Sequence, residues 1–285
     1  MSHFAIAGLQ LASSYGNNLQ SIAEEIENCK KRFPWLDMLV LGELNSFGPE
    51  KKYAEPMPGP TETFYCDLAK RLDIWLIPGS HYEQDGEQIF NTTSVINNQG
   101  QVVRRYRKIF PFCPYEKGVD SGTDIVVFDV PQGRIGVAIC YDLWFPELAR
   151  KMACEGAEVL IYPTMTGTID RAIELNLAKA TAAINQCYVI AINTAGELGN
   201  GQSIFVGPQG NAIYIAGDQQ EVIPIEIDFA QVRRDRERGL HNLGQPLKSF
   251  RDNQHIIAGL DSNSPSEFLD TLGPLSVPDK DDNSK

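Results

Sequence analysis

The sequence GVAICYDLWFPELAR, at residues 136–150, carries the strongest local pattern in the chain. Its first five residues are small or apolar and predict a buried strand that ends at Cys140. Phe145-Pro146-Glu147 then predicts the start of a helix, because proline suits the first helical turn. In open α/β sheets, ligands bind in the crevice beyond the carboxyl ends of the strands. The segment therefore predicts a strand, a turn and a helix, with a thiol at the edge of a binding crevice.

Cys140 is the one cysteine of six whose surroundings point to chemistry. The chain has no CxxC pair and no histidine at metal-ligand spacing from a cysteine, which predicts reduced thiols and no bound metal. For each cysteine the plain alternative is a small, buried hydrophobic side chain. At Cys140 an approaching helix N-terminus favours the thiolate, which is the form that attacks. Cys140 is therefore the candidate nucleophile.

Alternating strands and helices extend from this segment in both directions. On the N-terminal side, the residue patterns predict strands over 4–11, 37–43 and 74–80, helices over 17–32 and 61–72, and a hairpin of 91–97 with 101–107. Then follow a hairpin of 124–130 with 134–140, helices over 145–155 and 171–186, strands over 158–162 and 188–193, a hairpin of 203–206 with 212–215, and a strand over 221–227. This order predicts an α/β fold with mixed sheets, and its two halves resemble an internal duplication.

Composition restricts the kind of partner. Of the 285 residues, 42% are hydrophobic, which is enough for a large core, and 25 basic against 37 acidic residues give a net charge of −12. A chain this acidic argues against nucleic acid or an anionic membrane surface as the main partner. No apolar run reaches the ~20 residues of a membrane span, and the first residues lack the pattern of a secretory signal. We therefore expect a cytoplasmic protein.

Two stretches toward the end of the chain have plain interpretations. The charges of residues 233–238 alternate in sign on a predicted helix, which is typical of a solvated or subunit-facing surface. Residues 262–285 are polar and acidic and contain three prolines. This composition predicts a flexible tail, or an arm across a neighbouring subunit, that follows a domain over residues 1–261.

Two charged residues occupy predicted strand ends similar to that of Cys140. Glu43 ends the apolar strand over 37–43, where a carboxylate must be paired or have a shifted pKa, and such carboxylates are candidate general bases. Lys108 follows the strand over 101–107, although its basic surroundings by themselves indicate a solvated stretch. Together the three residues supply the nucleophile, the base and the cation that acyl transfer requires.

These residues stand in three blocks, GELNSFG around Glu43, YRKIFPF around Lys108 and the segment 136–150 around Cys140. In order and spacing the blocks resemble the signature motifs of the nitrilase superfamily of carbon–nitrogen hydrolases, and the similarity extends over roughly residues 4–252. The resemblance implies a four-layer αββα sandwich, no cofactor, and a homodimer or higher homo-oligomer that pairs through its helices.

The resemblance also implies a mechanism. Cys140 would attack the carbon of an amide or a nitrile, and Glu43 would accept the thiol proton and pass it to the leaving ammonia. Lys108 and the backbone N–H of Tyr141 would stabilise the oxyanion. Glu43 would then activate water to hydrolyse the thioester.

Two further residues are expected to bind substrate. Glu116 lies eight residues after Lys108, in a segment similar to that of short-chain aliphatic amidases and formamidases, where a second glutamate positions the substrate. The alternative for Glu116 is a solvated acid in a loop. Trp144, four residues after the candidate nucleophile, is interpreted either as a wall of the pocket or as ordinary packing.

The same blocks lead to several candidate reactions. Tyr141-Asp142 stands where nitrilases carry Trp-Glu, which favours amides over nitriles, while residues 143–147 resemble the N-carbamoylputrescine amidase branch. We therefore predict an amidase for a small linear, aliphatic amide that needs no metal. The alternatives are an N-carbamoyl amine or amino acid hydrolase, a nitrilase, transfer of the acyl group to an amine, and a non-catalytic binding protein with this fold.

Overall fold

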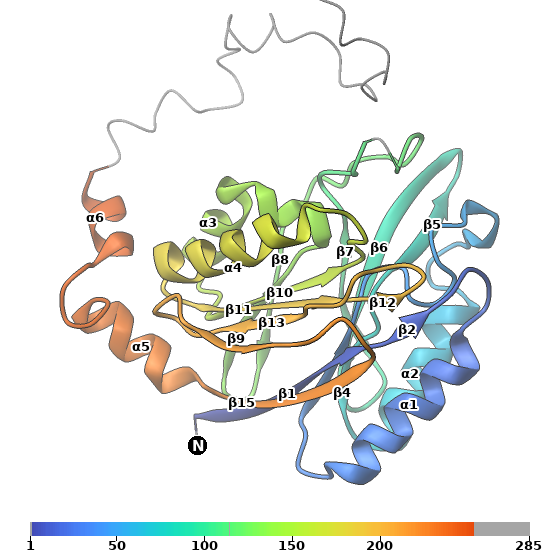
Figure 1. Cartoon of the computed structure of the whole chain (residues 1–285), viewed down its shortest axis with the longest axis horizontal. Coiled ribbons are helices and arrows are strands. Elements are labelled where there is room, and N and C mark those ends of the chain that lie inside the picture. Colours follow the sequence, from blue (N-terminus) through green and yellow to red (C-terminus); the bar gives the residue numbers. More distant parts are fainter. Residues whose placement is uncertain (1, 114, 254–285) are drawn as a thin grey trace, which may run out of the picture.

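Two mixed β-sheets face each other in the computed structural model, which describes residues 2–113 and 115–253 (Figure 1). The larger sheet has seven strands in the order β15-β1-β3-β4-β6-β5, with β7 also paired to β6. Strands β1, β3 and β4 run parallel, and the other pairs are antiparallel. The strands are β1 (His3–Gln10), β3 (Met38–Leu41), β4 (Trp75–Ile77), β5 (His81–Asp85), β6 (Gln88–Ile96), β7 (Val102–Arg107) and β15 (Glu221–Asp228).

The smaller sheet has six strands in the order β14-β13-β11-β10-β9-β8. Its three central strands β9, β10 and β11 run parallel, and the others pair antiparallel. A short parallel pair, β2 (Ala12–Ser13) with β12 (Ala195–Gly196), continues from β1 and β11. The strands of the smaller sheet are β8 (Val126–Val130), β9 (Gly133–Val137), β10 (Val159–Thr164), β11 (Tyr188–Asn193), β13 (Ile204–Val206) and β14 (Ala212–Ile215).

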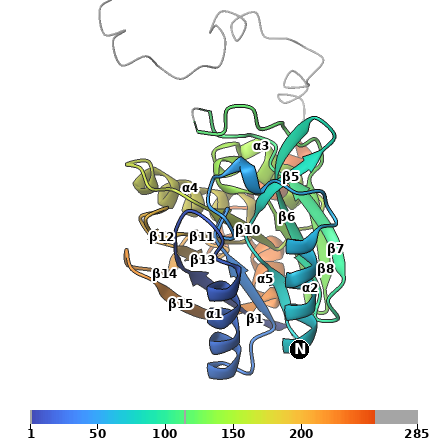
Figure 2. The ribbon, with the colours of Figure 1, turned by 90° about the vertical axis from the view of Figure 1, so that its right-hand side faces the viewer.

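Helices cover the outer faces of both sheets. Side chains alternate across each strand, and in β3 this sends Leu39 and Leu41 into the cluster beneath α1 (Leu19–Arg32) and α2 (Pro60–Leu72). Met38 and Val40 point the other way, into the cluster shared with the smaller sheet. Helices α3 (Pro146–Cys154) and α4 (Arg171–Asn185) cover the far side of the smaller sheet (Figures 1 and 2). The prediction of a four-layer αββα sandwich with mixed sheets is confirmed.

The described elements depart from the predicted ones mainly at their ends. The predicted strands over 37–43 and 134–140 are shorter, because β3 ends at Leu41 and β9 at Val137. Glu43 and Cys140 therefore lie in turns beyond the strands and not within them. Strand β15 returns to the larger sheet beside β1, so the two predicted halves do not correspond to two separate sheets. Strand β5 was not predicted.

The remaining helices are η1 (Lys51–Tyr53), η2 (Cys140–Trp144), α5 (Phe229–Arg238) and α6 (Pro246–Asp252), and α5 contains the helix predicted at 233–238. Within residues 2–113 and 115–253, no helix has the length and apolar character needed to cross a bilayer. The predicted tail over 262–285, and the domain boundary at residue 261, lie outside the described residues. Pairing of subunits through helices and a cytoplasmic location stay predictions.

Candidate active site

The candidate residues meet where the carboxyl ends of strands from both sheets come together. The backbone N–H of Glu43, just after β3, donates to the carbonyl of Thr164 at the end of β10, at 3.0 Å. A Cβ on Gly42 would lie 2.9 Å from the same carbonyl oxygen, so this close approach of the two chains requires glycine. Glu43 of the larger sheet is thereby fixed beside the strand ends of the smaller one.

Cys140 is the first residue of the 3₁₀ helix η2, which follows β9, and its backbone is strained. Its φ of 49° is in the left-handed region, which non-glycine residues adopt only where the surroundings hold them. The buried Asp142 carboxylate provides this support, because it accepts hydrogen bonds from the Ile139 N–H (2.9 Å), the Tyr106 hydroxyl (2.7 Å) and the Phe110 N–H (2.9 Å). Burial raises the pKa of Asp142 to about 6.

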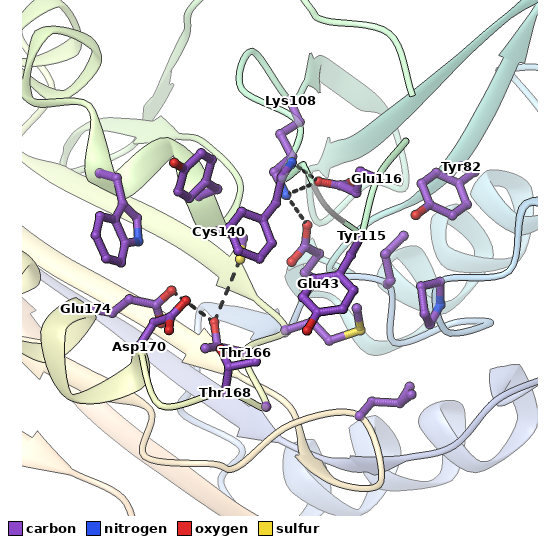
Figure 3. A pocket seen from close by; sticks show the side chains of 18 of the residues that line it. Glu43, Tyr82, Lys108, Tyr115, Glu116, Cys140, Thr166, Thr168, Asp170 and Glu174 are labelled. Atoms are coloured by element: carbon purple, nitrogen blue, oxygen red, sulfur yellow. Dashed lines mark hydrogen bonds and ion pairs between the residues drawn. The ribbon is translucent and has the colours of Figure 1, made fainter. Parts of the chain in front are cut away.

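Lys108 joins two glutamates in the interior. Its Nζ donates to Glu43 Oε1 at 2.7 Å and to Glu116 Oε2 at 2.6 Å (Figure 3). All three side chains are buried, with Lys108 only 1% exposed. The interpretations of Lys108 as part of a solvated stretch and of Glu116 as a solvated loop acid are therefore wrong. The neighbouring Arg105 and Arg107 pair with the buried carboxylates of Glu62 and Glu83.

The two glutamates differ in their pKa values. Burial and the nearby negative charge of Glu116 raise the pKa of Glu43, against the opposing effect of the Lys108 ammonium. Glu116 is also buried, which by itself raises its pKa, but Lys108 and hydrogen bonds from Phe112 and Asn91 bring the pKa below the ordinary value. Burial alone would lower the pKa of Lys108, but the charges of Glu43 and Glu116 raise it well above the ordinary value, so the ammonium stays charged. The cluster thus contains one persistent carboxylate, one persistent cation and one carboxyl group suited to accept a proton.

The thiol of Cys140 is held in its neutral form. Burial, and secondly the charge of Glu43, raise its pKa well above the ordinary value. The expectation that the N-terminus of the helix predicted over 145–155 favours the thiolate is therefore wrong for the resting site, because burial raises the pKa of the thiol. Attack by sulfur consequently requires a base that removes the proton. The Sγ lies 3.9 Å from Oγ1 of Thr166, whose hydroxyl donates to Glu174.

These groups line a cavity of about 220 Å³ (Figure 3). Tyr141 and Trp144 are in its wall, which agrees with the first of the two interpretations of Trp144. Within the described part of the chain, the N–H of Tyr141 meets no protein acceptor and is therefore available to a ligand. Among the described lining residues, Lys108 is the one cation. The lining residues are Tyr15, Glu43, Leu44, Pro49, Tyr82, Lys108, Phe112, Tyr115, Glu116, Cys140, Tyr141, Trp144, Met165, Thr166, Gly167, Thr168, Asp170, Glu174, Glu197 and Leu198.

Several residues that support this site were given no role by the sequence analysis. Asn91 in β6 bonds both glutamates, Asp142 and Tyr106 hold the turn of Cys140, and Thr166 lies beside its sulfur. Asp142 and Tyr106 stand in the motif blocks around Cys140 and Lys108. Asn91 also left a signal, because asparagine is uncommon within a strand. Among residues 2–113 and 115–253, no group of three or more His, Cys, Asp or Glu side chains has an arrangement that could hold a metal ion.

The two sheets of the four-layer sandwich enclose a thiol, two carboxylates and an ammonium. These groups are typical of a hydrolase that forms a covalent intermediate. Residues 4–237 match the family model of the carbon–nitrogen hydrolases, and the chain belongs to that family. It is a carbon–nitrogen hydrolase of the nitrilase superfamily.

Named relatives include two kinds of amidase. The omega-amidase NIT3 of Saccharomyces cerevisiae is 32% identical over 251 residues, which cover 78% of this chain and 86% of that protein. An N-carbamoylputrescine amidase of Solanum lycopersicum is 32% identical over 238 residues, covering 74% and 78%.

Solved structures agree with the fold. The crystal structure of Saccharomyces cerevisiae Nit3, described as a member of branch 10 of the nitrilase superfamily, has a TM-score of 0.77 at 31% identity and covers 83% of this chain and 94% of its own. An amidase of Nesterenkonia sp. AN1 has a TM-score of 0.74 at 23% identity, with 84% and 96% covered, and its likeness concerns the fold alone.

Proposed function

We propose that this enzyme hydrolyses a small linear, aliphatic amide to a carboxylate and ammonia through a thioester on Cys140. The observation that supports this most directly is the joint placement of Cys140, Glu43 and Lys108 in one cavity, with Glu43 bonded to Lys108 at 2.7 Å. A neutral thiol, a carboxyl group of raised pKa and a fixed ammonium are what a proton-coupled attack requires.

In the first half of the reaction, Glu43 takes the proton of Cys140 as sulfur bonds to the amide carbon. Lys108 has three N–H donors and uses two on the glutamates, so the third is available to the oxyanion together with the N–H of Tyr141. The C–N bond then breaks, and the proton on Glu43 moves to the departing nitrogen. Ammonia leaves, and the thioester remains.

In the second half, Glu43 removes a proton from water, and the resulting hydroxide attacks the thioester carbon. Collapse of this intermediate breaks the C–S bond, and the sulfur recovers its proton. The product is the free acid, which ionises to the carboxylate. Glu116 gains and loses no proton in this scheme, and serves to hold Lys108 and to position substrate beside it.

Ammonia release tests the proposal. The purified enzyme is incubated with formamide, acetamide, propionamide, succinamate, N-carbamoylputrescine and a short nitrile, alongside Cys140→Ala and the control Cys154→Ala, whose residue is exposed and outside the cavity. We expect turnover of amides by the wild type and the control, and none by Cys140→Ala. Equal turnover by Cys140→Ala, or turnover of the nitrile alone, contradicts the proposal.

The charge of the cavity favours a second candidate, a carbamoyl amine. Asp170 is half-buried at the start of α4, without a side-chain capping bond, and Glu197 is exposed; both line the cavity with Glu174. Lys108, the one cation of the described lining, is already engaged by two glutamates. A substrate with a positive tail therefore meets attraction at the outer wall, and one with a carboxylate tail meets repulsion.

Matched substrates separate the two candidates. 5-Aminopentanamide, pentanamide and glutaramate have cationic, neutral and anionic tails, and N-carbamoylputrescine is compared with neutral N-butylurea. Preference for pentanamide or glutaramate, which are both linear aliphatic amides, supports the first candidate, whereas preference for N-carbamoylputrescine supports the second. Glutaramate as the best substrate contradicts the argument from the charge of the cavity. Under the second candidate, Asp170→Asn, which keeps a good helix-capping residue, and Glu197→Gln each reduce the cationic preference by roughly two- to fivefold.

A further inference from the structure

Asn91 connects the two glutamates of the cavity. It lies inside β6, is 0% exposed, and its Nδ2 donates to Oε1 of Glu43 at 2.8 Å and to Oε1 of Glu116 at 2.7 Å. Both amide hydrogens are thereby used on carboxylates. The backbone carbonyl of Asn91 also accepts the N–H of Lys108 at 2.8 Å. One residue therefore contacts all three charged members of the site.

The orientation of this amide is determined by its neighbours. Its Oδ1 is buried and has no hydrogen-bond partner among the described residues. Exchanging Oδ1 and Nδ2 would place the oxygen against two carboxylate oxygens, which is repulsive, and would leave both carboxylates without this donor. An unsatisfied buried acceptor is normally unfavourable, so the two bonds to carboxylates must outweigh it.

Donors are distributed unequally between the two glutamates. Glu116 receives Asn91 on Oε1, and Lys108 and the N–H of Phe112 on Oε2, so both of its oxygens are occupied. Glu43 receives Asn91 and Lys108 on the same oxygen, Oε1. Within the described residues, no nitrogen donor binds Oε2 of Glu43. This oxygen is the one left for the Cys140 proton, since Glu43 and Cys140 line the same cavity.

We propose that Asn91 is a positioning residue that keeps Glu116 ionised and turns Glu43 so that its Oε2 receives the proton of Cys140. The inference rests on the proposed function, because it takes Glu43 as the base. The proton passes from Sγ to Oε2 and then to the leaving nitrogen, while Asn91 exchanges none. Hydrogen bonds to the ionised form of a carboxyl favour that form, so loss of Asn91 raises the pKa values of the pair.

The test is the pH dependence of two rates in Asn91→Ser and in the nearly isosteric Asn91→Asp. One rate is kcat/KM for the best amide; the other is alkylation of Cys140 by iodoacetamide, located by mass spectrometry, with exposed Cys154 as an internal reference. We expect the acid limb of both profiles to move up by about one to two pH units in Asn91→Ser. The shift in Asn91→Asp is at least as large, because it adds a third carboxyl group.

The matched control is Asn185→Ser. Asn185 is also fully buried, donates to the carbonyl of Thr181 and has an unpartnered Oδ1, but does not line the cavity. It should leave both acid limbs in place. If folded Asn91→Ser and Asn91→Asp keep the wild-type acid limbs, whatever their rates, Asn91 has only a structural role and the inference is overturned.

A further variant separates this inference from the function on which it rests. Glu43→Gln should abolish the acid limb of Cys140 alkylation if Glu43 is the base. If the wild type lacks that limb, or Glu43→Gln leaves it unchanged, the proposed mechanism itself fails. If Glu43→Gln behaves as expected and the Asn91 variants do not, only the role of Asn91 is refuted.

Discussion

The two sheets contribute different chemistry to the same cavity. The larger sheet brings charged groups: Glu43 after β3, Lys108 after β7, and Asn91 within β6 to orient them. The smaller sheet brings neutral groups at its strand ends, Cys140 after β9 and Thr166 after β10. The proton acceptor is thus on one sheet and the nucleophile is on the other.

Both sheets nevertheless have a turn with a left-handed residue beyond a strand. Leu44, directly after Glu43, has φ 50°, and Cys140 itself has φ 49°. In each case a sharp turn beyond a parallel strand directs a side chain toward the opposite sheet. Because base and nucleophile come from different sheets, the site is complete only when the sheets pack together. Variants on the larger sheet should therefore change the pH dependence, and variants on the smaller sheet should change the rate alone.

After loss of the nucleophile itself, the largest effect is expected for Glu43→Gln, which removes the proton acceptor of the larger sheet. We expect kcat/KM for the best amide to fall by about 10³-fold, within the usual range for loss of a general base, because the neutral thiol then has no acceptor. Steady-state kinetics measures this. Glu24→Gln, an exposed change on α1, is the control and should retain activity. Full activity in Glu43→Gln would place the base elsewhere.

Most of the fold could be predicted from the sequence because its patterns are local. Helix α2 at Pro60–Leu72 and the three hairpins lie close to their predicted positions, since apolar spacing and turn residues determine them. The pairing of β15 with β1 could not be predicted, because it joins segments over 200 residues apart by backbone bonds that depend little on side-chain identity. The true end of β9 was missed because the apolar residues Ala138 and Ile139 continue beyond it. The predicted end of β3 was placed two residues too late, at Glu43.

For the site, the sequence indicated residue types but not their environment. Glu43, Lys108, Glu116 and Cys140 do share a cavity, yet the raised pKa of the thiol depends on burial, which no local motif encodes. Asn91 lies in a stretch whose polar residues, 91–94, are all buried. Polar residues in a strand predict a solvent-exposed face, so sequence reasoning had no basis for placing them in the interior.

An intermediate effect is expected for Asp142→Asn, which alters the support of the nucleophile's turn. Burial raises the pKa of Asp142 from 3.8 in the unfolded chain to about 6, so the folded state binds this proton more tightly. The tighter binding of this proton contributes to the free energy of unfolding. The contribution is fully present below about pH 4 and is lost as the pH rises through about 6. We expect the stability of the wild type relative to Asp142→Asn to fall by up to about 3 kcal/mol over this interval.

Urea unfolding of both proteins at several pH values between 4.5 and 7 measures this difference. Tyr106→Phe is the matched variant, because it keeps the carboxyl group and removes one of its three hydrogen-bond donors. In Tyr106→Phe the free energy of unfolding should still fall with rising pH, and the fall should continue to higher pH than in the wild type, since fewer donors then stabilise the ionised carboxylate. A stability difference between wild type and Asp142→Asn that is constant or increases with pH contradicts the explanation.

The smallest effect is expected for Thr166→Val on the smaller sheet. The Thr166 hydroxyl donates to Glu174 at 3.0 Å, so its oxygen faces the sulfur of Cys140 as an acceptor, at 3.9 Å. A neutral bond of this length orients the thiol weakly, and its loss should reduce kcat by roughly three- to tenfold. The backbone should stay in place, because the Thr166 N–H donates to Asn193. Thr166→Ser should restore the rate.

The acid limb of the pH profile should not move in Thr166→Val or in Thr166→Ser, in contrast to Asn91→Ser. A shift of that limb in Thr166→Val would show that the smaller sheet also determines the pKa of the proton acceptor.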